Sequence, residues 1–108
     1  VDNGGKGSAF SPTDLVATAM GTCMATVMGL VAQRNNFSIE GLQIQVLKEM
    51  TADPVRRIGT LTTRLVFPKG KPLSTTDRAK LEAAARACPV KQSLHPDLKT
   101  PVEFVYPE

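Results

Sequence analysis

The stretch FSPTDLVATAMGTCMATVMGLVAQRN, which runs from Phe10 to Asn35, decides the fold. It predicts a helix whose N-cap is Ser11, a favoured capping residue, with Pro12 in the first helical position. Asp14 stands three residues after the cap, which is the capping-box spacing with Asp in place of Glu, and it faces the positive end of the helix dipole. We expect the helix to continue to about Arg34, after which two asparagines can end it.

The same stretch contains no charged side chain over the nineteen residues from Leu15 to Gln33, which is close to the length of a membrane span. Its threonines and glycines make it only mildly hydrophobic, however, and no aromatic belt or strong basic cluster flanks it. We therefore expect a fully buried helix at the centre of a domain or a dimer, and no membrane segment. Small residues that would let another backbone approach closely recur every four positions: Ala17, Gly21, Ala25 and Gly29.

The remainder of the chain predicts three strands and a second helix. Leu, Ile and Val alternate with Gln over Gly41–Met50, and Ile58–Phe67 is a second β-rich run, so we expect these two strands to pair antiparallel. Ser74 and Asp77 repeat the capping spacing ahead of DRAKLEAAARAC, a stretch with high helix propensity. A final strand is expected over Val102–Tyr106.

Pro89 marks a break after the second helix. The residue before a proline disfavours the α conformation, so the helix should end near Cys88. Pro89 can equally be the first residue of a short helix over PVKQSL. The order αββαβ predicts an α+β fold, in which a long buried central helix and a second helix pack on a mostly antiparallel sheet.

Length and composition predict one soluble domain over residues 1–108, with the glycine-rich residues 1–10 as a loop. The net charge of +3 is dispersed along the chain, and 5% of the residues are aromatic with no Trp, so we expect no nucleic-acid partner. A single His, and two cysteines that stand 65 positions apart, predict neither a structural metal nor a disulfide framework. Residues 1–10 lack the apolar core of a signal peptide, and we expect a cytoplasmic protein.

The two cysteines carry the candidate chemistry, although each also has a plain structural interpretation. A free cysteine is often a small buried hydrophobe, and within its own helix Cys23 has no cation or donor nearby that would favour a thiolate. Cys88 stands at the helix break, immediately before a candidate helix N-terminus, whose N–H groups and dipole would favour a thiolate. From the residues alone, packing and reactivity stay open for both thiols.

The combination GGKGSAFSPTDLVATAMGTC, followed after two strands and a helix by ARACPVKQSL, resembles the OsmC/Ohr family of osmotically inducible and organic hydroperoxide resistance proteins. The resemblance is carried by the Ser-Pro entry to a long helix with Cys23 near its middle, by the Cys-Pro-Val sequence at Cys88, and by the terminal strand. It covers the chain from about Gly4 onward. Any one of these features is weak, but together and in order they are fairly specific.

The resemblance implies an intertwined homodimer with two long central helices and active sites at the subunit interface. It also implies a thiol peroxidase, in which Cys23 would attack a peroxide as a thiolate and become a sulfenic acid, and Cys88 would condense with it to form a disulfide. External thiols or lipoyl-bearing proteins would reduce the pair, and no metal or organic cofactor would be needed. An apolar wall around Cys23 would suit an organic hydroperoxide better than hydrogen peroxide, and its expected members are Met20, Val27 and Leu30.

Two features depart from the family pattern. The family supports its thiolate with an arginine from an N-terminal β-segment, and we expect that segment to be absent from this chain. At the position ten before the first cysteine, where the family's peroxidases place Glu, this chain has Thr13, and Asp14 follows as a candidate catalytic substitute or as a helix-capping acid. The alternative function is therefore a non-catalytic dimeric protein of the same fold, which acts in stress or binds a small molecule. A generic thiol–disulfide oxidoreductase is less favoured because the chain lacks a CxxC motif.

Overall fold

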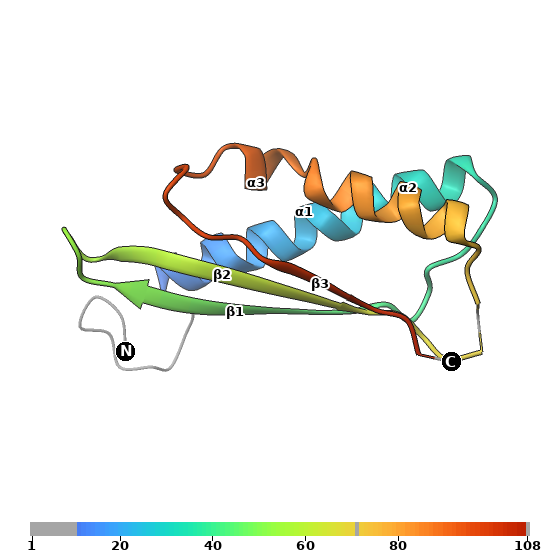
Figure 1. Cartoon of the computed structure of the whole chain (residues 1–108), viewed down its shortest axis with the longest axis horizontal. Coiled ribbons are helices and arrows are strands. Elements are labelled where there is room, and N and C mark those ends of the chain that lie inside the picture. Colours follow the sequence, from blue (N-terminus) through green and yellow to red (C-terminus); the bar gives the residue numbers. More distant parts are fainter. Residues whose placement is uncertain (1–10, 71, 108) are drawn as a thin grey trace.

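The computed structural model describes residues 11–70 and 72–107, so the loop expected over residues 1–10 lies outside the described residues. The α+β fold is confirmed, and the short helix that the sequence left open is present, which makes the observed order αββααβ (Figure 1). The described elements are α1 (Pro12–Arg34), β1 (Gln43–Thr51), β2 (Arg57–Val66), α2 (Thr75–Arg86), α3 (Pro89–Gln92) and β3 (Val102–Val105).

The sheet has the order β1-β2-β3, with β2 in the middle. β1 and β2 form the expected antiparallel pair, which runs from Gln43 opposite Val66 to Thr51 opposite Arg57. β3 pairs parallel to β2, because the chain leaves β2, crosses through α2 and α3, and returns in the same direction. The sheet is thus mostly antiparallel, with one parallel pair.

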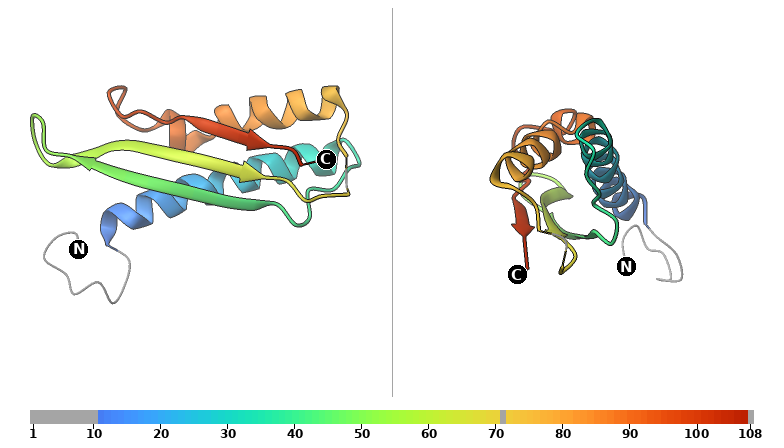
Figure 2. Two further views of the ribbon diagram at one scale, coloured as in Figure 1. Left: turned by 60° about the horizontal axis from the view of Figure 1, so that its bottom comes forward. Right: turned by 90° about the vertical axis from the view of Figure 1, so that its right-hand side faces the viewer.

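The helices form one layer of the fold and the sheet forms the other (Figures 1 and 2). α1 packs on β1, and α2 packs beside α1, so both helices cover the same face of the sheet. Three fully buried methionines at four-residue spacing, Met20, Met24 and Met28, form the inner face of α1. Alternate residues of β2 point into the same core, as the two-residue period of a strand requires: Leu61, Thr63 and Leu65.

Both expected helix caps are present. The Ser11 side chain accepts a hydrogen bond from the Asp14 N–H at 3.1 Å, and Asp14 Oδ2 accepts one from the Ser11 N–H at 3.2 Å, which completes a capping box. At α2, the Ser74 side chain accepts a hydrogen bond from the Asp77 N–H at 3.1 Å. Local side-chain chemistry therefore determines where each of these helices begins.

In the single chain α1 is buried on one side, whereas the sequence predicted burial on nearly all sides. Its outward face carries Thr18, Thr22 and Thr26, and two leucines are largely exposed, Leu15 at 57% and Leu30 at 45%. The helix is long and apolar enough to cross a membrane, with a mean hydropathy of 1.8. Core helices of soluble proteins can have the same length and hydropathy. The prediction that α1 lies at the centre of a dimer would require a second chain to cover this face.

Candidate active site

The structure brings together the two cysteines, which stand 65 positions apart in the sequence. Cys23 lies near the middle of α1, and Cys88 is the residue that precedes α3. α1 and α3 are in contact, and the two thiols are close enough for Cys23 to affect the ionisation of Cys88. Both cysteines are free in this structure, so the pair is a dithiol.

The break between α2 and α3 holds Cys88 in place. Cys88 leaves the helical conformation (φ −50°, ψ 126°), as the residue before a proline should. Pro89 then begins α3, and the Gln92 N–H donates to the Cys88 carbonyl oxygen at 3.0 Å. The Cys-Pro sequence thus ends one helix and starts the next, with the thiol at the corner between them.

The two thiols differ in their access to solvent. Cys88 is fully buried, with 0% of its surface exposed, whereas Cys23 is partly buried. A small molecule from solvent therefore reaches Cys23 first. Among the apolar residues expected around Cys23, Met20 is fully buried in the core and cannot line such an approach, whereas Val27 is partly buried and Leu30 is exposed.

Burial raises the pKa of the Cys88 thiol above its ordinary value, because desolvation disfavours the thiolate. The neighbouring Cys23 thiol raises this pKa further. The nearby backbone N–H groups of Val90 and Lys91, in the first turn of α3, lower the pKa, although the Cys88 side chain makes no capping hydrogen bond at the start of α3. The donors expected at the start of α3 are therefore present, but burial outweighs them.

Asp14 does not join the thiol pair within one chain. It stands nine residues before Cys23 in the same helix. That separation corresponds to about 13 Å along the helix axis and about two and a half turns around it, so the two side chains point to opposite sides. The Asp14 carboxylate instead completes the capping box and forms an ion pair with Lys48 of β1, with Oδ1 2.7 Å from Nζ. These contacts hold the pKa of Asp14 below its usual value, chiefly through the hydrogen bond from Lys48.

Lys48 is a residue of this region that the sequence analysis missed. Its Nζ donates to Thr13 Oγ1 at 2.8 Å in addition to its ion pair with Asp14, and its side chain is only 14% exposed. Its spacing in the sequence could have indicated that Lys48 points inward. Lys48 follows Ile44 and Val46 at two-residue intervals, on the face of β1 that packs against α1. An ammonium on the inner face of a strand requires an anionic partner on the helix opposite.

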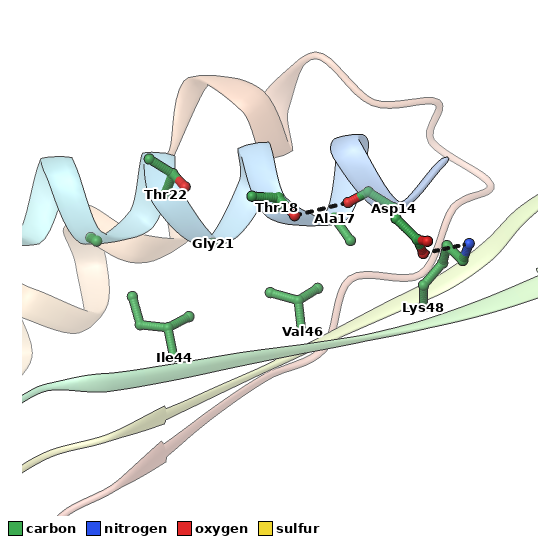
Figure 3. Close-up of a pocket in the computed structure, with 9 residues that line it drawn as sticks. Asp14, Ala17, Thr18, Gly21, Thr22, Ile44, Val46 and Lys48 are labelled. Atoms are coloured by element: carbon green, nitrogen blue, oxygen red, sulfur yellow. Dashed lines mark hydrogen bonds and ion pairs between the residues drawn. The ribbon is translucent and has the colours of Figure 1, made fainter. Parts of the chain in front are cut away.

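A groove of about 520 Å³ lies between α1 and β1, with the Asp14–Lys48 pair at one end (Figure 3). The walls come close at Gly21, where an added Cβ would lie 3.1 Å from Val46 Cγ2. Because Gly21 and Cys23 lie about 200° apart around the helix axis, the groove and the thiol pair are on different sides of α1. The groove is lined by Asp14, Ala17, Thr18, Gly21, Thr22 and Ala25 of α1 and by Ile44, Val46 and Lys48 of β1.

The chemistry that this site offers is that of two neighbouring thiols, one of which is accessible. In such an arrangement an oxidised thiol can condense with its neighbour to form a disulfide. In the part of the chain that the structure describes, no group of three or more His, Cys, Asp or Glu side chains is placed to hold a metal ion.

A long cysteine-bearing helix on a small sheet, with a second thiol at a helix break beside it, defines an α+β protein with a dithiol site. The sequence matches the OsmC-like protein family over residues 5–103, and the chain belongs to this family. A comparison with curated proteins found no significant match.

Solved structures share this fold. A Psychrobacter arcticus protein, provisionally named as an osmotic stress induced and detoxification response protein, is 39% identical, with a TM-score of 0.85 over 95% of this chain and 73% of that one. An organic hydroperoxide resistance protein OsmC from Legionella pneumophila is 19% identical, with a TM-score of 0.76 over 95% of this chain and 74% of that one. The organic hydroperoxide resistance protein OhrB of Bacillus subtilis is 20% identical, with a TM-score of 0.72 over 90% of this chain and 71% of that one.

Proposed function

We propose that this protein is a thiol-dependent peroxidase that reduces organic hydroperoxides in oxidative stress defence. The observation that carries the proposal is the proximity of the partly exposed thiol of Cys23 to the buried thiol of Cys88 in the same hydrophobic cluster. Membership of the OsmC-like family supports it, because two structurally similar proteins are named organic hydroperoxide resistance proteins.

The reaction takes place in two steps at the thiol pair. The Cys23 thiolate attacks one peroxide oxygen, so that an S–O bond forms, the O–O bond breaks, and the departing alkoxide takes up a proton to leave as an alcohol. The Cys88 sulfur then attacks the Cys23 sulfur, so that the S–S bond forms and the S–O bond breaks. The oxygen leaves as water with the proton that Cys88 gives up. Two external thiols, or one dithiol such as a lipoyl group, reduce the disulfide and restore the pair.

The substrate class follows from the surface beside Cys23. Val27 and Leu30 lie one and two turns further along α1 on the same side as Cys23, and they offer apolar contacts to an organic group. We expect cumene hydroperoxide to oxidise Cys23 faster than hydrogen peroxide does. Stopped-flow measurement of the two rates checks this preference, and equal or reversed rates would contradict it.

Mass spectrometry tests the proposed chemistry directly. After one equivalent of organic hydroperoxide is added to the reduced protein, we expect an intramolecular disulfide between Cys23 and Cys88. Cys23→Ser should abolish peroxide consumption, and Cys88→Ser should leave a sulfenic acid that can be trapped on Cys23. If both thiols stay free under conditions in which a control peroxidase reacts, the proposal is wrong.

The second candidate is a non-catalytic dimeric protein that binds a small molecule. The groove beside Gly21 favours it, because a volume of about 520 Å³ is within the usual range of ligand pockets and the lining is largely apolar. In that case the thiols stay free in the mass-spectrometric experiment. We expect either protein to act as a cytoplasmic homodimer.

A further inference from the structure

The groove between α1 and β1 has apolar walls and one polar end. Apart from two threonines at its rim, the side chains along its length are small or apolar: Ala17, Gly21, Ala25, Ile44 and Val46. Among the described residues that line it, the charged ones are Asp14 and Lys48, which lie together at one end (Figure 3). Ligand sites in proteins usually combine such a lining with a few polar groups that orient the ligand.

The charge of Lys48 is a feature that the fold itself does not require. The capping box explains Asp14, but Lys48 stands on the inner face of β1 with its side chain only 14% exposed. Removing an ammonium from water is costly, and replacement of a buried ion pair by apolar residues of similar volume is often neutral or stabilising. A role in binding accounts for an ion pair at the end of an apolar groove.

The contacts of this ion pair determine which head group the polar end accepts. Lys48 Nζ donates to Asp14 Oδ1 at 2.7 Å, to Thr13 Oγ1 at 2.8 Å and to Ser11 Oγ at 3.4 Å, so its three protons are already used. The Asp14 carboxylate is partly exposed, and each of its oxygens has a second lone pair. Because the two charges cancel, the polar end suits an uncharged group that donates a hydrogen bond.

The shape of the groove suits an aliphatic chain. From Asp14 to Ala25 the groove follows α1 for about 16 Å along the helix axis. The walls approach each other at Gly21, where an added Cβ would lie 3.1 Å from Val46 Cγ2. A volume of about 520 Å³ spread over this length admits a slender apolar chain better than a bulky ring system.

We propose that the groove binds an unbranched aliphatic alcohol, with its chain along the apolar walls and its hydroxyl donating a hydrogen bond to the Asp14 carboxylate. The site goes beyond the proposed peroxidase function, since the groove and the thiol pair lie on different sides of α1. It gives the second candidate function a ligand class. Thr18 and Thr22 are exposed at the rim, so a second chain over this face of α1 would lie across the open side of the groove.

NMR titration of the ¹⁵N-labelled protein with octanol and with its methyl ether tests the head group. We expect the largest shift changes at the lining residues of α1 and β1. Octanol should bind more tightly than the ether, on the order of 10-fold, as for one hydrogen bond to a charged group. Asp14→Ala should remove this preference, because it removes the acceptor while the apolar walls remain.

A substitution within the groove tests the position of the chain. Ala25→Leu places a larger side chain among the lining residues, and it should weaken octanol binding by at least about 10-fold because it fills part of the volume. Ala19→Leu is the matched control. Ala19 is exposed on the same helix and does not line the groove, so octanol should bind this variant as it binds wild type.

The proposal is wrong if octanol does not bind wild type, if it binds Ala25→Leu equally well, or if wild type does not distinguish it from the ether. Shift changes centred on Cys23 and Val27 would show that octanol binds beside the thiols instead. Loss of self-association in Ala25→Leu, with no octanol binding to wild type, would show that a second copy of this chain fills the groove. Cys23→Ser should bind octanol as wild type does, so the ligand site and the peroxidase function can fail separately.

Discussion

Asp14 has three contacts that favour its charged form. Lys48 Nζ lies 2.7 Å from one carboxylate oxygen, the Ser11 N–H donates to the other at 3.2 Å, and the positive end of the α1 dipole is adjacent. The first two lower the pKa of Asp14, with Lys48 contributing more. Because the ion pair joins the first turn of α1 to β1, Asp14 fixes how the helix begins and also how it sits on the sheet.

We predict that Asp14→Asn lowers the free energy of unfolding at neutral pH, since it weakens a cap and a partly exposed ion pair. The folded-state pKa of Asp14 lies below the ordinary value of 3.8, so its stabilisation is fully present above that pH and is lost as the pH falls through the folded-state pKa. Urea unfolding of both proteins should therefore show a difference that is constant near neutrality and shrinks in acid.

Asp77→Asn removes the charge of the acid at the equivalent position in the first turn of α2 and serves as the control for that charge alone. The oxidation rate of Cys23 in Asp14→Asn then distinguishes the two roles that the sequence allowed for this residue. An unchanged rate is expected for a structural acid on the other side of the helix. A tenfold loss of rate in a folded Asp14→Asn protein would show instead that Asp14 supports the thiols.

The beginnings of the helices could be predicted because each depends on neighbouring residues. Each cap forms within four residues, from Ser11 to Asp14 in α1 and from Ser74 to Asp77 in α2. The ring of Pro89 by itself predicts that a helix ends beside Cys88. The two cysteines were named as a pair from the resemblance of the chain to a family. Nothing in their spacing along the sequence requires them to meet.

The parallel pairing of β3 and the inward positions of Lys48 and Thr63 could not be predicted in the same way. Each depends on segments distant in the sequence: Lys48 on the start of α1, Thr63 on the helices that bury this face of the sheet, and β3 on the crossover through α2. A polar residue at two-residue spacing within an apolar strand was the available signal for both side chains. Which face such a residue occupies becomes clear only when the facing helix is known.

The two glycines in the four-residue pattern of small residues on α1 have different surroundings. At Gly21 an added Cβ would lie 3.1 Å from Val46 Cγ2 and 3.4 Å from Ile44 Cγ2, so the close approach is to the side chains of a strand. At Gly29 an added Cβ meets nothing within 4 Å among the described residues. The first glycine is explained by packing within one chain, and the second is not.

We predict that Gly29→Ala raises the free energy of unfolding by about 0.5–1 kcal/mol, because alanine favours the helix and its methyl group meets no obstacle in the single chain. Gly21→Ala should be at least about 1 kcal/mol less favourable than Gly29→Ala, since Val46 is β-branched and cannot easily move aside. Chemical denaturation of both variants measures the difference. Destabilisation by Gly29→Ala would contradict this expectation and would indicate that another chain lies against Gly29.

The outward face of α1 is an apolar surface that the single chain leaves uncovered. It carries two exposed leucines, Leu15 and Leu30, and a row of threonines along a helix of 23 residues, about 35 Å long. Threonine presents a methyl group as well as a hydroxyl, and both Thr18 and Thr26 bond their hydroxyls to α1 carbonyls, which leaves the methyl groups facing outward. A face of this kind is suited to burial against another chain.

We predict that the protein is a homodimer in which this face of α1 is covered, and that Thr22→Arg disrupts the dimer. Thr22 is exposed in the single chain and lies at the edge of the groove, so an arginine there would be desolvated on association without a partner for its charge. Sedimentation equilibrium should show a dissociation constant raised by at least about 100-fold, whereas Ala83→Arg on the exposed side of α2 should dimerise as wild type does. A wild-type protein that is monomeric at high micromolar concentration, or a Thr22→Arg variant that dimerises normally, would show that α1 packs in another way.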